Sequence, residues 1–260
     1  MDVLIVGAGD VGRWFGDAVD ARVAFADIDE QTAATAAEAI GGRAVSLEGD
    51  ERFDAVCLAV PMTHVEAAIG DHANRAREAI LDVSGVMGPA LEAMTEHAPD
   101  RERVSLHPLF APERAPGSIA VVRDAPGPVS GELLGALEAR GNELVETTAA
   151  EHDEAMESVQ AAAHAAVLSF ALAADPAPSG FETPVYEVLY DLVETVTGGT
   201  PRVYADIQKT FRGAEAVADA ANRLAAADAD GFESLYREAA TRWAEAGGDE
   251  DEPTGVQGRD

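Results

Sequence analysis

Short apolar runs rich in β-branched residues alternate with amphipathic stretches from the start of the chain to residue 147. Apolar runs bounded by turn residues predict buried strands, and apolar positions at helical spacing predict helices. The expected strands cover residues 3–6, 22–26, 43–47, 53–60, 79–83, 103–106, 119–122 and 143–147. The expected helices cover residues 10–19, 30–40, 63–72, 89–97 and 129–140. This alternation predicts an α/β domain, 1–147, with a doubly wound, mostly parallel sheet.

The pattern becomes entirely helical after residue 147. Its most apolar run, Ala161–Ala174, is hydrophobic on every face of a helix. Such a helix has to be buried on all sides, which one small helical domain can hardly achieve alone. We therefore expect residues 148–247 to form an all-helical dimerisation domain of an intertwined homodimer. The polar, acidic tail, 248–260, is predicted to be disordered.

The charge balance is extreme for 260 residues: 48 Asp and Glu face 18 Lys and Arg, for a net charge of −30. Lys209 is the only lysine. A surface this acidic repels nucleic acid and anionic membranes, so we expect neither as a partner. It suits molar salt, where the Debye length falls to about 3 Å and self-repulsion is screened. The composition therefore predicts a halophilic protein.

The number of cysteines and the length of the apolar runs indicate in which cellular compartment the protein is expected. Cys57 is the single cysteine, so no disulfide framework is expected. The 14-residue run Ala161–Ala174 is short of the ~20 residues needed to cross a bilayer. The first strand begins at residue 2 or 3 with no signal peptide before it, so we expect a cytoplasmic protein. The sequence suggests no metal site.

A glycine-rich turn lies between the first predicted strand and the first predicted helix. Gly7, Gly9 and Gly12 have the G-x-G-x-x-G spacing of a Rossmann-type dinucleotide-binding domain. Gly7 allows the tight turn, Gly9 lets the backbone approach a pyrophosphate, and Gly12 lets the helix lie close to the sheet. The free N–H groups and the positive dipole end of that helix then face the phosphates.

Asp27 ends the second strand, 20 residues after Gly7. A carboxylate there can bind ribose hydroxyls and would repel a 2′-phosphate, so we predict NAD rather than NADP as cofactor. Pro61 ends the strand 53–60 at the carboxyl edge of the sheet, where ligands bind in doubly wound folds. The predicted cofactor-binding residues are Gly7, Gly9, Asp10, Val11, Gly12, Asp27, Val60 and Pro61.

His107 closes a predicted strand at the same carboxyl edge, and Pro108 restricts it to extended geometry. An imidazole that faces a nicotinamide there has a suitable pKa to accept a hydroxyl proton as hydride leaves. The alternative is a loop histidine that only packs between prolines.

Gln160 and His164 lie one turn apart on the first long helix of the helical half, about 6 Å along its axis, and could bind one small substrate together. The alternative for His164 is a core histidine bonded to a backbone carbonyl. His152 precedes His164 by about 18 Å of helix, so both cannot touch one small ligand. We interpret His152 as structural, or close to the cofactor.

Several of these blocks occur in the same order in prephenate dehydrogenases, and the chain resembles that family over residues 1–245. The blocks are Gly7–Gly12 with Asp27, Leu106–Pro112, Glu151–Asp153 followed by Gln160 and His164, Thr183–Tyr186, and Tyr204–Ile207. The resemblance implies NAD(P)-dependent oxidative decarboxylation of prephenate to 4-hydroxyphenylpyruvate, a step towards tyrosine, by a homodimer. His107 would accept the C4-hydroxyl proton during hydride transfer, and Gln160 and His164 would bind the substrate.

The chain departs from the family pattern in two places. The family has Asp-x-x-Ser-Val-Lys where this chain has Asp82–Met87, so glycine stands at the serine position and Ser84 comes one residue early. We nevertheless assign Ser84 as a catalytic partner of His107. The family arginine that binds a substrate carboxylate has no clear match, and Arg212 and Arg223 are the candidates, with an exposed helical arginine as the alternative for each.

Other functions stay open at this stage. Arogenate dehydrogenase has the same fold and chemistry, and the sequence hardly separates the two substrates. A different two-domain Rossmann dehydrogenase for a hydroxy acid, or a non-catalytic dinucleotide sensor, are more distant alternatives. We expect a monofunctional enzyme without a fused mutase or regulatory domain.

Overall fold

The computed structural model describes residues 1–246 of the chain. Contacts divide the chain into two compact units, Met1–Gly213 and a second that begins at Ala214. The tail predicted to be disordered, 248–260, lies outside the described residues. The predicted domain boundary between residues 147 and 148 remains a prediction.

An eight-stranded sheet with the order β3-β2-β1-β4-β5-β6-β7-β8 forms the centre of the first unit. Neighbouring strands are parallel except for β6 and β7, which are antiparallel. This order from β3 to β6 is that of a doubly wound dinucleotide-binding sheet, with its switch point between β1 and β4. The strands are β1 (Asp2–Val6), β2 (Arg22–Ala26), β3 (Arg43–Ala44), β4 (Phe53–Leu58), β5 (Ala76–Asp82), β6 (Glu102–Pro108), β7 (Ser118–Ala125) and β8 (Glu143–Glu146).

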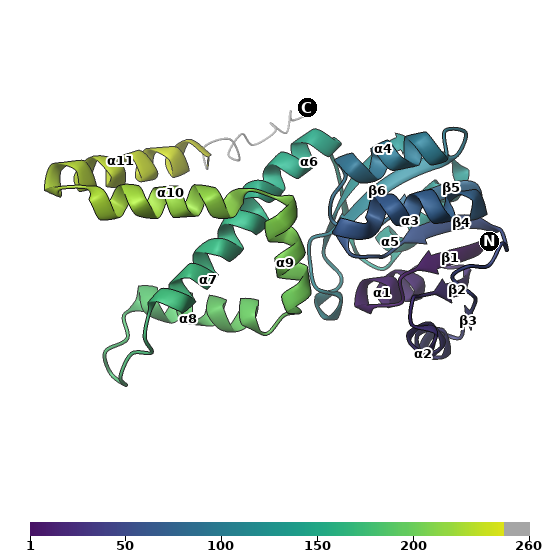
Figure 1. Cartoon of the computed structure of the whole chain (residues 1–260), viewed down its shortest axis with the longest axis horizontal. Helices are drawn as coiled ribbons and strands as arrows, with labels where there is room; N and C mark the ends of the chain where they lie inside the picture. Colours follow the sequence, from purple (N-terminus) through teal and green to yellow (C-terminus); the bar gives the residue numbers. More distant parts are fainter. Residues whose placement is uncertain (247–260) are drawn as a thin grey trace, which may run out of the picture. The chain divides into compact units, whose positions relative to one another are not determined.

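Helices cover both faces of the sheet, which is why its central strands are apolar almost throughout (Figure 1). In β1, Val3 and Ile5 join one apolar cluster, and Leu4 and Val6 join the other, as the two-residue period of a strand requires. The helices on the first face are α1 (Asp10–Ala18), α2 (Glu30–Ile40) and α5 (Pro128–Ala139). Those on the second face are α3 (Val65–His72) and α4 (Gly88–His97).

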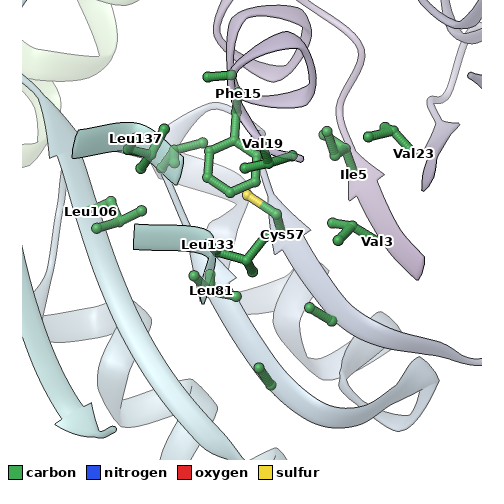
Figure 2. Close-up of a cluster of buried hydrophobic side chains, with 14 of the residues drawn as sticks. Val3, Ile5, Phe15, Val19, Val23, Cys57, Leu81, Leu106, Leu133 and Leu137 are labelled. Carbon is green, nitrogen blue, oxygen red and sulfur yellow. The ribbon is translucent and has the colours of Figure 1, made fainter. Parts of the chain in front are cut away.

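Figure 2 shows the first cluster from inside. Phe15 of α1 and Leu133 and Leu137 of α5 close over the strands, and Cys57 of β4 lies among them. These side chains are fully or almost fully buried, and burial of one such apolar side chain stabilises the fold by about 1.5–3 kcal/mol. The cluster fixes α1 against the sheet, which places the glycine-rich turn at the carboxyl edge.

The strands and helices predicted for the first 147 residues are all present, so the predicted α/β architecture is confirmed. The strand predicted at 43–47 is shorter, because β3 comprises only Arg43–Ala44. Both residues are exposed at the edge of the sheet, where a strand pairs on one side only.

The first unit continues with α6 (Ala149–Met156), α7 (Ala163–Ala173), α8 (Pro184–Thr197) and α9 (Pro201–Thr210). Thr148 and Glu151 form a capping box that begins α6. Between α6 and α7 the chain forms a π-helix, η4 (Glu157–Ala162). No strand follows β8 in the described part of the chain, so the prediction of a helical second half is confirmed.

Helix α7 is apolar, yet none of its residues is buried within the single chain. Leu172 is 88% exposed, and α7 packs against α8, where Phe170 meets the ring of Tyr186. Further exposed apolar side chains follow on α8 and the loop before it: Phe181, Val185, Val188, Tyr190 and Leu192. The burial on all sides that we expected for this helix is therefore not achieved by the chain alone.

The second unit is a helical hairpin of α10 (Gly213–Ala226) and α11 (Ala229–Ala246) (Figure 1). Arg223 of α10 and Glu238 of α11 form a bidentate ion pair at 2.7 and 3.2 Å that ties the two helices together. None of the described helices is long and apolar enough to cross a membrane.

Candidate active site

The loop between β1 and α1 leaves room for the phosphates of a ligand. Gly7 has a φ of 100°, and a Cβ there would lie 2.3 Å from the carbonyl oxygen of Ala59. A Cβ on Gly12 would lie 2.1 Å from the carbonyl oxygen of Gly7, whereas one on Gly9 would meet nothing within 4 Å. The chain's own backbone therefore requires Gly7 and Gly12, and Gly9 leaves open space at the N-terminus of α1.

Asp27, directly after β2, is fixed beside this loop. Its two carboxylate oxygens accept hydrogen bonds from the backbone N–H groups of Ala8 at 2.8 Å and Asp29 at 2.9 Å. An open glycine, a helix N-terminus and a fixed carboxylate together fit a dinucleotide, with the pyrophosphate at α1 and the ribose at Asp27.

The other predicted cofactor residues lie around the same loop. Asp10 and Val11 form the first turn of α1, where Asp10 pairs with Arg13. Val60 and Pro61 follow β4, and Val60 lies against Gly7. The structure therefore brings all eight predicted cofactor residues to one corner of the sheet.

His107, at the carboxyl end of β6, contacts two side chains from the helical part of the first unit. Its Nδ1 lies 2.9 Å from Nε2 of His152, and its Nε2 lies 3.2 Å from Nε2 of Gln160. His107 is 8% exposed. Burial and the neighbouring His152 lower the pKa of His107 to about 3, so its imidazole is neutral at physiological pH.

Asp153 completes this group, and we call His107, His152, Asp153 and Gln160 the histidine cluster. Asp153 lies 2.7 Å from Nδ1 of His152 and accepts hydrogen bonds from the backbone N–H groups of Met87 and Gly88, at 3.0 and 2.9 Å. Partial burial favours the neutral acid, yet these hydrogen bonds outweigh it and lower the pKa of Asp153.

The contact between His152 and His107 was missed at the sequence level. Helical spacing separates His152 from His164, and that separation says nothing about which strand end His152 approaches. The available signal was the adjacent pair His152-Asp153, because a carboxylate next to a histidine often orients its ring.

The π-helix η4 explains how His152 and Gln160 can both reach His107. In an uninterrupted α-helix these two residues, eight positions apart, would differ by about 80° around the axis. A π turn holds an additional residue and rotates less per residue, which brings Gln160 round towards the face of His152. Single π turns of this kind occur frequently at functional sites.

Gly213 lies directly against η4. A Cβ on Gly213 would lie 2.2 Å from the backbone nitrogen of Ala162 and 2.2 Å from the carbonyl oxygen of Glu157. The carboxylate of Glu157 also accepts a hydrogen bond from the backbone N–H of Arg212, at 2.5 Å. The junction between α9 and α10 is therefore seated closely on the π turn that carries Gln160.

Ser84 does not occupy the position beside His107 that we predicted for it. Its backbone N–H and its hydroxyl both donate to Asp82, which is fully buried at the end of β5. Gly85 instead faces the imidazole, since a Cβ there would lie 3.1 Å from Nε2 of His107. A side chain at this position would crowd Nε2. The catalytic role of Ser84 stays a prediction.

His164 is on α7, and its ring packs edge-on against Tyr204 of α9 with the centroids 4.8 Å apart. Partial burial lowers its pKa. Among the described residues, its Nδ1 and Oε1 of Gln160 are buried without a hydrogen-bond partner. These two atoms lack the partner that buried polar atoms usually have.

The two candidate arginines differ in their surroundings. Arg212 is exposed directly after α9, and its backbone is held by Glu157 of η4. Arg223 belongs to the second unit, where Glu238 pairs with it. The substrate-binding role of both arginines stays a prediction.

Comparison with known proteins finds two curated relatives of the chain. A 4-amino-4-deoxyprephenate dehydrogenase from Streptomyces pristinaespiralis is 32% identical over 247 residues, which cover 85% of this chain and 81% of that relative. A protein from Methanocaldococcus jannaschii named as an arogenate/prephenate dehydrogenase is 27% identical over 178 residues, 63% of this chain and 40% of its own length. No family model matches the chain.

A solved structure shares the fold. Prephenate dehydrogenase from A. aeolicus, in complex with hydroxyphenyl propionate and NAD+, superposes with a TM-score of 0.68 at 17% identity, over 95% of this chain and 94% of that one.

The doubly wound sheet, the glycine-rich turn and the helical part beside it define an oxidoreductase of the dehydrogenase class with a Rossmann-type fold. The alignment with the S. pristinaespiralis relative covers most of both chains. The chain belongs to the prephenate dehydrogenase family.

Proposed function

We propose that this chain catalyses the NAD-dependent oxidative decarboxylation of prephenate to 4-hydroxyphenylpyruvate. The observation that carries the proposal is the neutral, buried imidazole of His107, whose Nε2 faces Gly85 and the amide of Gln160. Strands β1, β4, β5 and β6 are parallel, so His107 and the glycine-rich turn lie at one edge of the sheet. Oxidation at a hydroxyl-bearing carbon requires such a proton acceptor next to a hydride acceptor.

NAD, when bound, supplies the acceptor for the hydride that leaves C4 of the substrate. Nε2 of His107 takes the proton of the C4 hydroxyl as the hydride departs. Loss of CO2 returns the electron pair of the broken C–C bond to the ring, which becomes aromatic, and His107 returns its proton to the same oxygen. The protein therefore mainly orients the substrate and holds one proton.

The substrate contacts that we propose come from Gln160 and His164, with Arg212 or Arg223 for a carboxylate. Arogenate, which has an amino group in place of the keto group of the side chain, is the alternative substrate. One observation favours a second candidate, 4-amino-4-deoxyprephenate. The Streptomyces pristinaespiralis relative, 32% identical to this chain, is named as a dehydrogenase of this compound.

For the cofactor we propose NAD over NADP. The carboxylate of Asp27 is anchored at the ribose position, where it accepts from hydroxyls and repels a phosphate. The A. aeolicus structure, which contains NAD+, supports this choice.

We also propose that the chain works as a homodimer through its helical half. The exposed apolar side chains of α7 and α8 are the support, since large exposed apolar surfaces often mark protein interfaces. Light scattering should give twice the mass of the chain, and an active monomer would contradict the proposal.

The decisive assay uses the full chain in molar salt, with NAD or NADP and each of the three substrates. We expect the highest kcat/KM with prephenate and NAD. His107→Asn should lower kcat at least ~100-fold while leaving the Kd of NAD unchanged. Full turnover by this variant would remove His107 from the mechanism, and no oxidation of any of the three substrates would refute the function.

A further inference from the structure

We propose that His152 and Asp153 are positioning residues, which hold His107 in the tautomer whose Nε2 is free of hydrogen and receive the charge when that nitrogen takes a proton. The inference rests on the proposed function of His107 as proton acceptor. It adds a reason why this imidazole accepts at Nε2 rather than donates there.

The series of hydrogen bonds that sets the tautomer begins at the carboxylate of Asp153. It accepts from the first backbone N–H groups of α4, at Met87 and Gly88, which a helix N-terminus offers to an anion. An ionised carboxylate only accepts hydrogen bonds. The contact of 2.7 Å with His152 therefore requires a hydrogen on Nδ1 of His152.

The remaining hydrogens follow from this first one. In the proposed resting state His152 is neutral, so with a hydrogen on Nδ1 its Nε2 is bare and accepts. The contact of 2.9 Å to His107 then places a hydrogen on Nδ1 of His107 and leaves Nε2 bare. The side-chain amide of Gln160 lies 3.2 Å from that Nε2, where its NH2 group can donate to the bare nitrogen.

The same contacts can hold the positive charge during the reaction. When Nε2 of His107 takes the substrate proton, the hydrogen on Nδ1 can move 2.9 Å to Nε2 of His152. His152 is then an imidazolium directly beside the Asp153 carboxylate, and His107 is neutral again. No other reactant is needed, and the reverse transfer restores the starting state when the proton returns to the product oxygen.

The tautomer can be measured without substrate or turnover. Long-range 1H–15N correlation spectra of the 15N-labelled chain in molar salt distinguish bare from protonated ring nitrogens, and the His107→Asn variant assigns the His107 signals. We expect Nδ1 of His107 to carry the hydrogen and Nε2 to be bare at neutral pH. A hydrogen on Nε2 would overturn this proposal. The proposed oxidative decarboxylation would not be affected, because the substrate assay tests it separately.

Two variants of His152 separate positioning from folding. His152→Leu removes the acceptor, so we expect mixed tautomers of His107 and a kcat about 100-fold lower, with KM changed only a few-fold. His152→Gln keeps a carbonyl that can accept from Nδ1 of His107 but cannot hold a proton. It should retain the tautomer and recover part of kcat.

The exposed His97, at the end of α4, provides the matched control. His97→Asn should change neither the His107 signals nor kcat. Wild-type kcat in His152→Leu, or equal losses in the Leu and Gln variants with an unchanged His107 tautomer, would overturn the proposal.

Discussion

The glycine-rich turn and the histidine cluster are the two halves of the candidate site, and they are built by opposite means. The turn consists of consecutive residues, Gly7–Gly12, and offers backbone N–H groups in open space. The histidine cluster consists of side chains from β6, α6 and η4, mostly buried and bonded to one another. The turn can approach a ligand only where side chains are absent. The proposed proton transfer in the histidine cluster depends on which ring nitrogen carries a hydrogen.

This difference predicts how each half fails. In the turn, any added side chain harms binding or the fold, whatever its chemistry. In the cluster, a side chain of similar shape can keep the fold intact while the reaction slows, because only the hydrogen-bond pattern has changed.

Substitutions in the turn should give the largest effects. Gly7→Ala forces a Cβ to 2.3 Å from a carbonyl oxygen at a φ of 100°, so we expect a loss of several kcal/mol in the free energy of unfolding. Chemical denaturation in molar salt measures it.

Gly9→Ala is the matched control, because a Cβ there meets nothing within 4 Å. The apo protein should keep its stability, while the Kd of NAD rises at least tenfold as the methyl group enters the phosphate space. Unchanged NAD affinity in this variant would show that the turn does not hold the pyrophosphate.

A substitution at Gly213 tests whether the cluster also depends on a glycine. In Gly213→Ala the Cβ would press on the backbone of η4, so Gln160 should shift relative to His107. Because this clash is also with backbone atoms, we expect a lower free energy of unfolding. In the folded variant kcat should fall about tenfold, with the Kd of NAD unchanged.

Gly131→Ala on α5, where a Cβ meets nothing within 4 Å, is the control. It should stabilise the helix by up to about 1 kcal/mol and leave kcat unaltered. If Gly213→Ala retains full kcat, the position of the π turn does not control the reaction.

The smallest expected effect concerns Asp82, which is buried beneath the cluster. Burial raises the pKa of Asp82 to about 6, against the lowering effect of its hydrogen bonds with neighbouring serines. Because the folded pKa lies above the unfolded value, its stabilising contribution is present at low pH and is lost as pH rises through about 6.

Asp82→Asn should therefore be more stable than the wild type above pH 6, by on the order of 1 kcal/mol. The gain should shrink as pH falls towards 4. Urea unfolding at two pH values measures this, and a variant that is less stable above pH 6 would contradict the assignment.

The two halves also differ in how far the sequence alone predicts them. The glycine-rich turn and Asp27 are close in sequence and belong to one βα unit, so local spacing placed them correctly at the edge of the sheet. The sheet itself follows from the period of its apolar positions. The strand at 43–47 was predicted too long, because its few edge contacts leave no periodic signal.

The histidine cluster required the tertiary structure. His107 was recognised at the end of a strand, but its partners approach from a helix that is 45 residues further along the chain. Helical spacing assumed a uniform rotation per residue, and the π turn breaks that assumption at Gln160. Ser84 was chosen by its nearness in sequence to the family serine, whereas its hydroxyl is held by Asp82.

Insertion of one residue converts a turn of α-helix into a π turn, so η4 makes the number of residues here as important as their identity. Removal of one residue between Glu157 and Ala162 would straighten the helix and leave α6 and α7 in their present registers. The amide of Gln160 would swing away from the imidazole, although every polar side chain of the cluster would still be encoded.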